Sequence, residues 1–495
     1  MHAINRLHHR AAELTHLNNI MALLQWDQEV MMPSGGAEGR GAQVATLSSI
    51  IHQKICDPVL GNLLLEAAES SGKASARDRA LVRVMQREHD RNTRMPEKFV
   101  AAFARLTSRA LPVWVRARKE NDFGLFLPLL EQIIAMCREK AGFLGYTDHP
   151  YDALLDLYEE GLTTRLLDPL FAGLRDELAP LLQQTASAVE KRDLLADLAP
   201  MPRHDQVRFS ETLLKEIGYD FNNGRQDVSA HPFTTSLGHR DRRVTNRFRP
   251  DSLEFIFSGL HEGGHALYEQ NIAAELADSP LDEGVSLGIH ESQSRLWENI
   301  IGRSRPFWQR YYPLLQEFFP VQFKDVGLDD FVRAINRVEP GMIRVEADEV
   351  SYNLHVLVRF ELEKELLGGT LEAAELPGLW NDKYKNCLGV RVDSDANGVL
   401  QDIHWAHGSF GYFPTYTIGN LAAAQIWQAY RAFDPAWTET LQQGNLAKIL
   451  RWLTEKIYRF GGLYPPADLL QRVCGEELDS SHFLAYLKNK PEFCL

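Results

Sequence analysis

Several features that define whole classes of protein are scarce or missing in this sequence of 495 residues. Its five cysteines are widely spaced and form no C-x-x-C pair, so we expect no disulfide framework. No apolar run approaches the roughly 18 residues of a membrane-spanning helix, and the N-terminus lacks the apolar core of a secretion signal. The net charge is −14, and no basic stretch is present that would neutralise nucleic-acid phosphates. The sequence therefore predicts a cytoplasmic protein that binds neither membranes nor nucleic acid.

The residues that are present form mainly helical patterns. Hydrophobic residues make up 44% and charged residues 24% of the chain, as is usual for a globular protein. Apolar periodicity and short breaks predict helices at 38–55, 58–71, 76–92, 97–120, 126–143 and 163–190. Only residues 219–249, which contain Asn-Asn-Gly, are typical of strands and turns. We therefore expect an all-α fold with one small antiparallel sheet.

The most informative stretch is His-Glu-Gly-Gly-His at residues 261–265, an H-E-x-x-H pattern. Helical periodicity from about Asp251 to Gln270 places the two histidines one turn apart on one helix face. His261 and His265 can bind one metal ion there, and Glu262 can take a proton from a water molecule on that ion. Each interior glycine costs roughly 1 kcal/mol relative to alanine. We therefore expect a substrate or a packed helix to approach this backbone closely.

A third ligand is expected from the next helical stretch, which begins near residue 287. It carries Glu291, and two histidines with a glutamate form the ligand set of thermolysin-type zinc sites. His290 is the alternative third ligand. Many zinc peptidases with this pattern have an acid four residues after the ligand glutamate, but that position is Arg295 here. A hydrogen-bond partner for the histidines must therefore come from elsewhere. Zn²⁺ suits these ligands, and the sequence does not exclude Co²⁺.

These residues, together with motifs elsewhere, resemble the carboxypeptidase Taq family of thermostable metallocarboxypeptidases. The family's H-P-F, D-x-R-x-T, I-R-x-x-A-D and G-x-x-Q-D-x-H-W motifs are matched at residues 231–233, 241–245, 343–348 and 398–405. The resemblance covers essentially the whole chain and implies a saddle-shaped, mostly helical homodimer with a deep groove. It also implies an enzyme that releases single residues from peptides with a free C-terminus, with broad specificity. We accordingly expect one metallopeptidase domain over 1–495, with an N-terminal helical part at 1–200 and a catalytic part with the metal site at 201–495.

The resemblance also implies roles for particular residues. His261, His265 and Glu291 would bind the metal, and Glu262 would be the general base. The family motifs supply the substrate-binding candidates, which are His231, Arg243, Arg344, Gln401, Asp402 and His404. Arg344 would hold the terminal carboxylate of the substrate, because a guanidinium binds a carboxylate with two parallel hydrogen bonds. Arg243 is a second candidate for that role, with a structural ion pair as the alternative.

A further group would stabilise the oxyanion that forms during peptide hydrolysis. Residues 407–416 resemble the H-x-x-x-G-Y-x-x-x-Y stretch of helical zinc oligopeptidases, in which His and Tyr serve this purpose. The catalytic candidates here are Tyr412, then Tyr416 and His407, with His404 as a further one. The alternative for each is aromatic packing beside a loop.

Three other functions have to be distinguished from a carboxypeptidase. A thimet-type zinc oligopeptidase would use the same chemistry but cut inside peptides. A non-haem Fe(II) oxygenase also uses two histidines and a carboxylate, although those ligands usually lie on strands. A binding scaffold with a structural metal would need no base, so the position of Glu262 argues against it.

Overall fold

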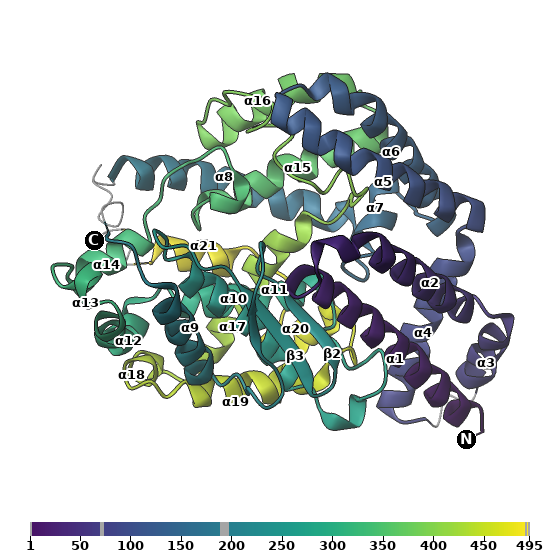
Figure 1. The fold of residues 1–495 in the computed structure, drawn as a ribbon, viewed down its shortest axis with the longest axis horizontal. Helices are drawn as coiled ribbons and strands as arrows, with labels where there is room; N and C mark the ends of the chain where they lie inside the picture. The colour runs from purple at the N-terminus through teal and green to yellow at the C-terminus, as the bar shows by residue number, and fades with distance from the viewer. Residues whose placement is uncertain (1, 70–73, 189–197, 491–492, 494–495) are drawn as a thin grey trace. The chain divides into compact units, whose positions relative to one another are not determined.

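The computed structural model describes residues 2–69, 74–188, 198–490 and 493, and helices dominate it (Figure 1). The prediction of a mainly helical fold with one small sheet is confirmed. In these described residues, no helix combines the length and the apolar character needed to cross a membrane. The four cysteines that the structure describes, Cys56, Cys137, Cys387 and Cys474, are all free.

The chain folds into two compact units, each built from segments far apart in the sequence. Unit 1 consists of residues 1–93, 193–332 and 423–477, and unit 2 of residues 94–192, 333–422 and 478–495. Both units therefore draw on the two halves of the chain. The division into parts at 1–200 and 201–495 stays a prediction.

Unit 1 contains the sheet and the helices that carry the H-E-x-x-H motif and Glu291. The helices that lie wholly or mostly in it are α1 (His2–Val30), α2 (Ala37–Ile55), α3 (Pro58–Glu69), α4 (Ala76–Arg94), α9 (Arg203–Ile217), α10 (Glu254–Gln270), α11 (Leu287–Arg295), α12 (Arg305–Phe318), α13 (Pro320–Phe323), α14 (Leu328–Ile335), α18 (Trp437–Gln442), α19 (Leu446–Lys456) and α20 (Pro466–Cys474). It also contains the short helices η1 (Ser34–Gly36), η3 (Ala274–Leu276) and η7 (Tyr458–Phe460), and the π-helical segment η4 (Leu296–Ile301).

The described residues of unit 2 form helices and loops and include no strand. Its helices are α5 (Glu97–Glu120), α6 (Phe123–Leu144), α7 (Pro150–Leu155), α8 (Thr164–Ala188), α15 (Ser351–Gly368), α16 (Leu376–Leu388) and α21 (Ser481–Lys488), with short turns η5 (Arg344–Glu346) and η6 (Ala373–Glu375). Helix α17 (Pro414–Phe433) begins in unit 2 and ends in unit 1.

The helices predicted in the first 190 residues are confirmed. Their observed ends differ from the predicted ones by three residues or fewer wherever the structure describes them. Two predicted ends, at 70–71 and 189–190, lie outside the described residues.

The sheet has three strands, β1 (Gln226–Val228), β2 (Thr234–Gly238) and β3 (Asp241–Asn246), in the order β1-β3-β2. Strands β2 and β3 are antiparallel, but β1 runs parallel to β3, so the prediction of an antiparallel sheet is wrong for β1. The short connection between β1 and β2 crosses from one edge of β3 to the other. Ser229 N donates to Asn246 O on one side of β3, whereas Thr245 N donates to Phe233 O on the other side.

Helix α10 lies against α9, α11 and the strand β3 (Figure 1). It begins at Glu254, three residues later than predicted, and ends at Gln270 as predicted. A Cβ on Gly264 would lie only 2.6 Å from the backbone oxygen of Gln293 in α11. A Cβ on Gly263 would lie 2.7 Å from Leu214 Cδ2, at the end of an α9 side chain. The hypothesis that a packed helix explains these two glycines is therefore confirmed.

Candidate metal centre and active site

Three side chains converge in unit 1. His261 and His265 lie one turn apart on α10, and Glu291 comes from α11, whose backbone touches α10 at Gly264. One ligand atom from each of the three lies within 4.8 Å of the others. The glycine contact explains this geometry, because only a close approach of the two helices lets a glutamate side chain reach the histidines.

The donor atoms have the spacing that a metal ion requires. Glu291 Oε2 lies 3.4 Å from His265 Nε2 and 3.7 Å from His261 Nε2. A tetrahedral zinc site with bonds of about 2.0–2.1 Å needs ligand atoms roughly 3.3 Å apart. The residues therefore fit a divalent metal with little movement.

A carboxylate outside this set orients the first histidine. Glu298 Oε2 lies 2.8 Å from His261 Nδ1, and the π-helical segment η4 carries Glu298. Although burial opposes it, Arg295 and His261 lower the pKa of Glu298 to about 2, so this carboxylate is ionised and can only accept. His261 Nδ1 therefore donates, and Nε2 faces Glu291. Although burial opposes it, Glu291 and Glu298 raise the pKa of His261 to about 9, so a metal would have to displace a proton from Nε2.

The candidate ligand Glu291 is held ionised by an arginine of its own helix. Arg295 Nε donates to Glu291 Oε1 at 2.7 Å, and Ser294 Oγ lies 3.1 Å from Oε2. Burial alone would raise the pKa of Glu291, but Arg295 and His261 lower it well below its usual value. The arginine that replaces the acid expected at this position thus supports the ligand instead of the histidines.

The second histidine is neutral. Burial, together with His290, lowers the pKa of His265 to about 3, and the neutral imidazole is the form that binds a metal. The His290 ring stacks on it with 4.3 Å between ring centroids and a 14° interplanar angle. Glu269 Oε1 lies 3.0 Å from His290 Nε2, so the alternative third ligand is engaged by a carboxylate. His265 Nδ1 has no hydrogen-bond partner among the described residues.

Glu262 lies beside the two histidines and is held by the sheet. Thr234 Oγ1, on β2, donates to Glu262 Oε2 at 2.7 Å and lies 3.0 Å from the backbone oxygen of the same residue. Burial raises the pKa of Glu262. The carboxylate therefore has a fixed orientation and an increased affinity for a proton, as a general base requires.

Sequence reasoning missed both of these supporting residues. Glu298 follows Glu291 by seven residues, which is close to two helical turns. The spacing alone therefore predicts that the two glutamates lie on the same face of the helix. Thr234 gave no signal of this kind, because it contacts Glu262 only through the packing of β2 on α10.

Two further candidates lie in unit 1. The guanidinium of Arg243 binds Asp241 through two hydrogen bonds of 2.8 Å, and its Cζ lies 4.3 Å from the ring centroid of Trp26 in α1. His231 is exposed. A substrate-binding role for either residue stays a prediction, and the ion pair that was the alternative for Arg243 is present.

The arginine of the I-R-x-x-A-D motif belongs to a buried charge cluster in unit 2. Arg344 Nη2 donates to Asp402 Oδ1 at 2.7 Å, and Arg359 Nε donates to the other oxygen, Oδ2, at 2.6 Å. Arg344 Nη1 also lies 3.1 Å from Tyr352 OH. Gln401 Oε1 accepts from the backbone N of Arg344 at 2.9 Å, which fixes the chain there. Two guanidinium groups share one carboxylate, so the cluster has one excess positive charge.

Three of the oxyanion candidates lie beside this cluster. The ring centroids of His404 and Tyr412 are 5.3 Å apart, as are those of Tyr412 and Tyr416. The Cζ atom of Arg344 lies 5.0 Å from the centroid of Tyr416, and His404 Nε2 lies 3.3 Å from its hydroxyl. His407 is exposed. The structure therefore groups His404 and the two tyrosines with Arg344, and the role of each stays a prediction.

A buried carboxylate positions the segment that carries these residues. Glu363 on α15 accepts from Trp405 Nε1 at 2.8 Å, from Gly411 N at 3.0 Å and from Tyr151 OH at 2.6 Å. It therefore anchors the residues on both sides of His407.

Comparisons with known proteins agree on one family. The model of the carboxypeptidase Taq (M32) metallopeptidases matches residues 6–491. "Thermostable carboxypeptidase 1" of Thermus thermophilus is 42% identical over 491 residues, which is 97% of this chain and 96% of that protein. "Carboxypeptidase 1" of Bacillus subtilis is 41% identical over 478 residues, which is 96% of this chain and 95% of that protein. The crystal structure of the M32 carboxypeptidase from Deinococcus radiodurans R1 is 37% identical, covers 100% of both chains and has a TM-score of 0.97.

Proposed function

This chain belongs to the carboxypeptidase Taq (M32) metallopeptidase family, and from that premise we propose that His261, His265 and Glu291 form its catalytic metal site, with Glu262 as the general base. The protein is a metallocarboxypeptidase, a hydrolase that depends on a divalent metal and acts on peptides. The observation that supports this site is the convergence of three ligand atoms within 4.8 Å beside a buried glutamate.

The chemistry follows from the positions of the residues in unit 1. A divalent metal in such a site polarises the scissile carbonyl and lowers the pKa of water. Glu262, oriented by Thr234, takes a proton from the attacking water and delivers it to the leaving amine. Glu298 keeps Nε2 of His261 free as a ligand throughout.

The motif residues around Arg344 and Gln401 bind and polarise the substrate in this proposal. Arg344 holds the terminal carboxylate, because its cluster with Asp402 and Arg359 has an excess positive charge. Tyr412, or failing it Tyr416, donates a hydrogen bond to the oxyanion, with His404 and His407 as the remaining candidates. Gln401 and Asp402 act through Arg344, since both bind it directly.

The remaining parts of the proposal concern the metal, the assembly and the compartment. Zn²⁺ is the proposed ion, since two imidazoles and one carboxylate form a catalytic zinc ligand set, and Co²⁺ is the alternative. We also propose a cytoplasmic homodimer that acts as a single metallopeptidase domain, with His231 and Arg243 contributing to substrate binding.

One experiment tests the activity directly. A short peptide with a free C-terminus and its C-terminal amide are each incubated with the enzyme, with and without a chelator, and the released amino acids are measured. Stepwise release of single residues from the free acid alone, abolished by the chelator, is the expected result. Internal cleavage of both peptides would indicate a thimet-type oligopeptidase, which the relatives do not favour. Failure to cleave either peptide, with metal bound, would contradict the peptidase function.

A further inference from the structure

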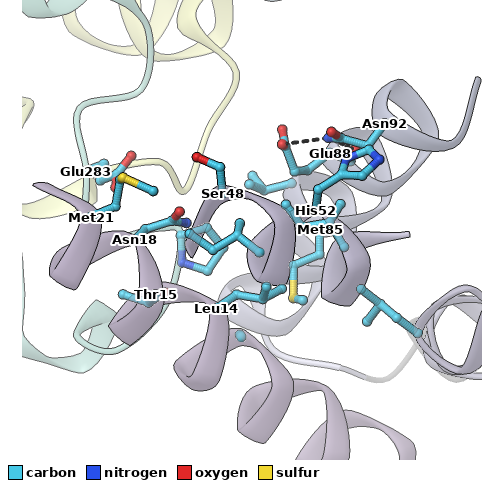
Figure 2. Close-up of a pocket in the computed structure, with 16 residues that line it drawn as sticks. Leu14, Thr15, Asn18, Met21, Ser48, His52, Met85, Glu88, Asn92 and Glu283 are labelled. Carbon is cyan, nitrogen blue, oxygen red and sulfur yellow. Dashed lines mark hydrogen bonds between the residues drawn. The ribbon is translucent and has the colours of Figure 1, made fainter. Parts of the chain in front are cut away.

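A cavity of about 560 Å³ lies in unit 1, apart from the metal ligands (Figure 2). Its wall is formed by α1, α2, α3 and α4 and by the loop that precedes α11. Aliphatic side chains such as Leu14, Ile51 and Met85 form much of this wall. Its volume is within the range of roughly 300–1,000 Å³ that is usual for small-ligand sites.

Two carboxylates face the cavity from opposite ends. Figure 2 shows Glu283, from the loop, at one end and Glu88, from α4, at the other. Glu88 accepts a hydrogen bond of 2.8 Å from Asn92 Nδ2. The Glu283 carboxylate has no hydrogen-bond or ion-pair partner in the part of the chain that the structure describes, and no Lys or Arg is among the described residues lining the cavity. When either carboxylate is ionised, no Lys or Arg side chain of the described cavity lining compensates its charge.

The surroundings of Glu283 oppose its ionisation. Glu283 is exposed to solvent, although protein atoms surround its carboxylate. This surrounding protein, together with the nearby Glu269 carboxylate, raises the pKa of Glu283 to about 7, and Arg242 opposes this effect. Arg242 is already engaged, because its Nη2 lies 2.9 Å from Asp282 Oδ2 and its Nη1 lies 3.6 Å from Glu269 Oε2. A cation bound in the cavity would relieve this repulsion between carboxylates.

The Glu283 end of the cavity is linked to the metal centre. Gly284 N, in the next residue, donates to Glu269 Oε1, and the same oxygen lies 3.0 Å from His290 Nε2. The ring of His290 stacks in turn on His265. One Glu269 side chain thus separates the loop of Glu283 from the ring that stacks on a metal ligand.

We propose that this cavity is a subsite for a cationic group of the peptide substrate, on the N-terminal side of the cleaved bond. The inference rests on the proposed function. A carboxypeptidase has only the released residue on the C-terminal side, so any further part of the substrate extends in the N-terminal direction. The cationic group is a lysine or arginine side chain or the N-terminal ammonium. Glu283 binds it directly, and Glu88 attracts it from the far end.

The test compares peptides that share one C-terminal residue. The parent peptide is N-acetylated and contains norleucine throughout the remaining positions. A scanned series places one lysine at each of the first four positions before the cleaved bond, and a last peptide has the parent sequence with a free N-terminus. The expected result is a kcat/KM about tenfold above that of the parent for at least one charged peptide, as for a partly desolvated charge pair. The series distinguishes a side-chain cation from the N-terminal ammonium.

Variants assign the effect to the cavity. Glu283→Gln and Glu88→Gln should each reduce the ratio of charged to parent peptide, and Glu283→Gln should bring it close to one. Glu275→Gln removes the same charge from an exposed position nearby on η3 and should leave the ratio unchanged. If one of the two cavity variants fails to fold, the other still tests the subsite.

The outcomes separate this inference from the proposed function. Release from the parent peptide without any gain from a positive charge would overturn the subsite and leave the carboxypeptidase function intact. A gain that survives in the folded cavity variants would also overturn it. If no peptide of the series is processed, the proposed function fails and the subsite fails with it.

Discussion

Glu298 Oε2 lies 2.8 Å from Nδ1 of His261, which makes this glutamate the partner that orients a proposed metal ligand. The residue comes from a π-helical segment, a feature that is rare and often found at functional sites. Its hydrogen bond to the histidine would replace the one that, in many zinc peptidases, comes from an acid four residues after the ligand glutamate. In the proposed site, the carboxylate that orients a histidine therefore comes from seven residues after Glu291.

Replacing Glu298 by glutamine should weaken metal binding. The neutral amide would form a weaker hydrogen bond with Nδ1–H of His261 and would orient the imidazole less firmly. The affinity for the metal should therefore fall about 10- to 100-fold. Competition with a chelator of known affinity measures this change. Glu317→Gln, at an exposed position on α12, is the control and should bind metal as the parent does. Unchanged affinity in Glu298→Gln would show that the contact is not needed for binding.

Replacing Glu262 by glutamine should separate metal binding from catalysis. The residue is not a ligand in the proposed site, so the metal content per chain, measured by elemental analysis, should be retained. Turnover should fall about 10²- to 10⁴-fold, because the amide cannot accept a proton. Thr234→Val, which removes the hydrogen bond to the Glu262 carboxylate, should cause a smaller loss. Substantial turnover in Glu262→Gln would rule out its role as the base.

The two glycines of the H-E-x-x-H helix should respond differently to alanine. A Cβ at Gly264 would meet the α11 backbone at 2.6 Å, and backbone cannot move aside without displacing Glu291. Overpacking of this kind costs about 1–3 kcal/mol, so Gly264→Ala should lower both the free energy of unfolding and the metal affinity. Gly263→Ala meets only the ends of the Leu214 and Ile217 side chains and gains helix propensity, so its effect should be smaller. Denaturant unfolding and metal titration check both, and equal effects would contradict the role of the α10–α11 contact.

The charge cluster of unit 2 should make stability depend on pH. Although burial opposes it, Arg359 and Arg344 hold the pKa of Asp402 far below the unfolded value of about 3.9. The folded state then binds fewer protons at this site, so its contribution to stability is complete above about pH 4 and is lost as the pH falls further. Asp402→Asn should be less stable at pH 7 by about 3–5 kcal/mol, since it leaves two buried arginines unpaired.

The comparison that isolates this group is the slope of stability against pH. Between about pH 5 and pH 3, the free energy of unfolding should fall less steeply in Asp402→Asn than in the parent. Asp382→Asn, an exposed change in the same unit, should keep the parental slope. If the free energy of unfolding falls equally steeply with pH in all three proteins, the arginines do not lower the pKa of Asp402.

Much of the metal site could be predicted from the sequence because it depends on local geometry. His261 and His265 share a helix face through a spacing of four residues, and Glu291 lies on the next helix along the chain. The two glycines indicated a close approach, and the structure shows α11 at Gly264 and α9 side chains at Gly263. The pairing of β1 was predicted wrongly, because the path of the chain around β3 has no signature in residue type.

The sequence by itself determined the helical class, the family and the spacing of the ligands, since these follow from periodicity and from motifs in a fixed order. The tertiary structure decided which polar groups became partners. Thr234 meets Glu262 and His290 stacks on His265 only because segments distant in the chain pack together. The free carboxylate of Glu283 is likewise a consequence of packing. Arg242 pairs with Asp282 and Glu269, so Glu283 faces a cavity without a partner among the residues that the structure describes.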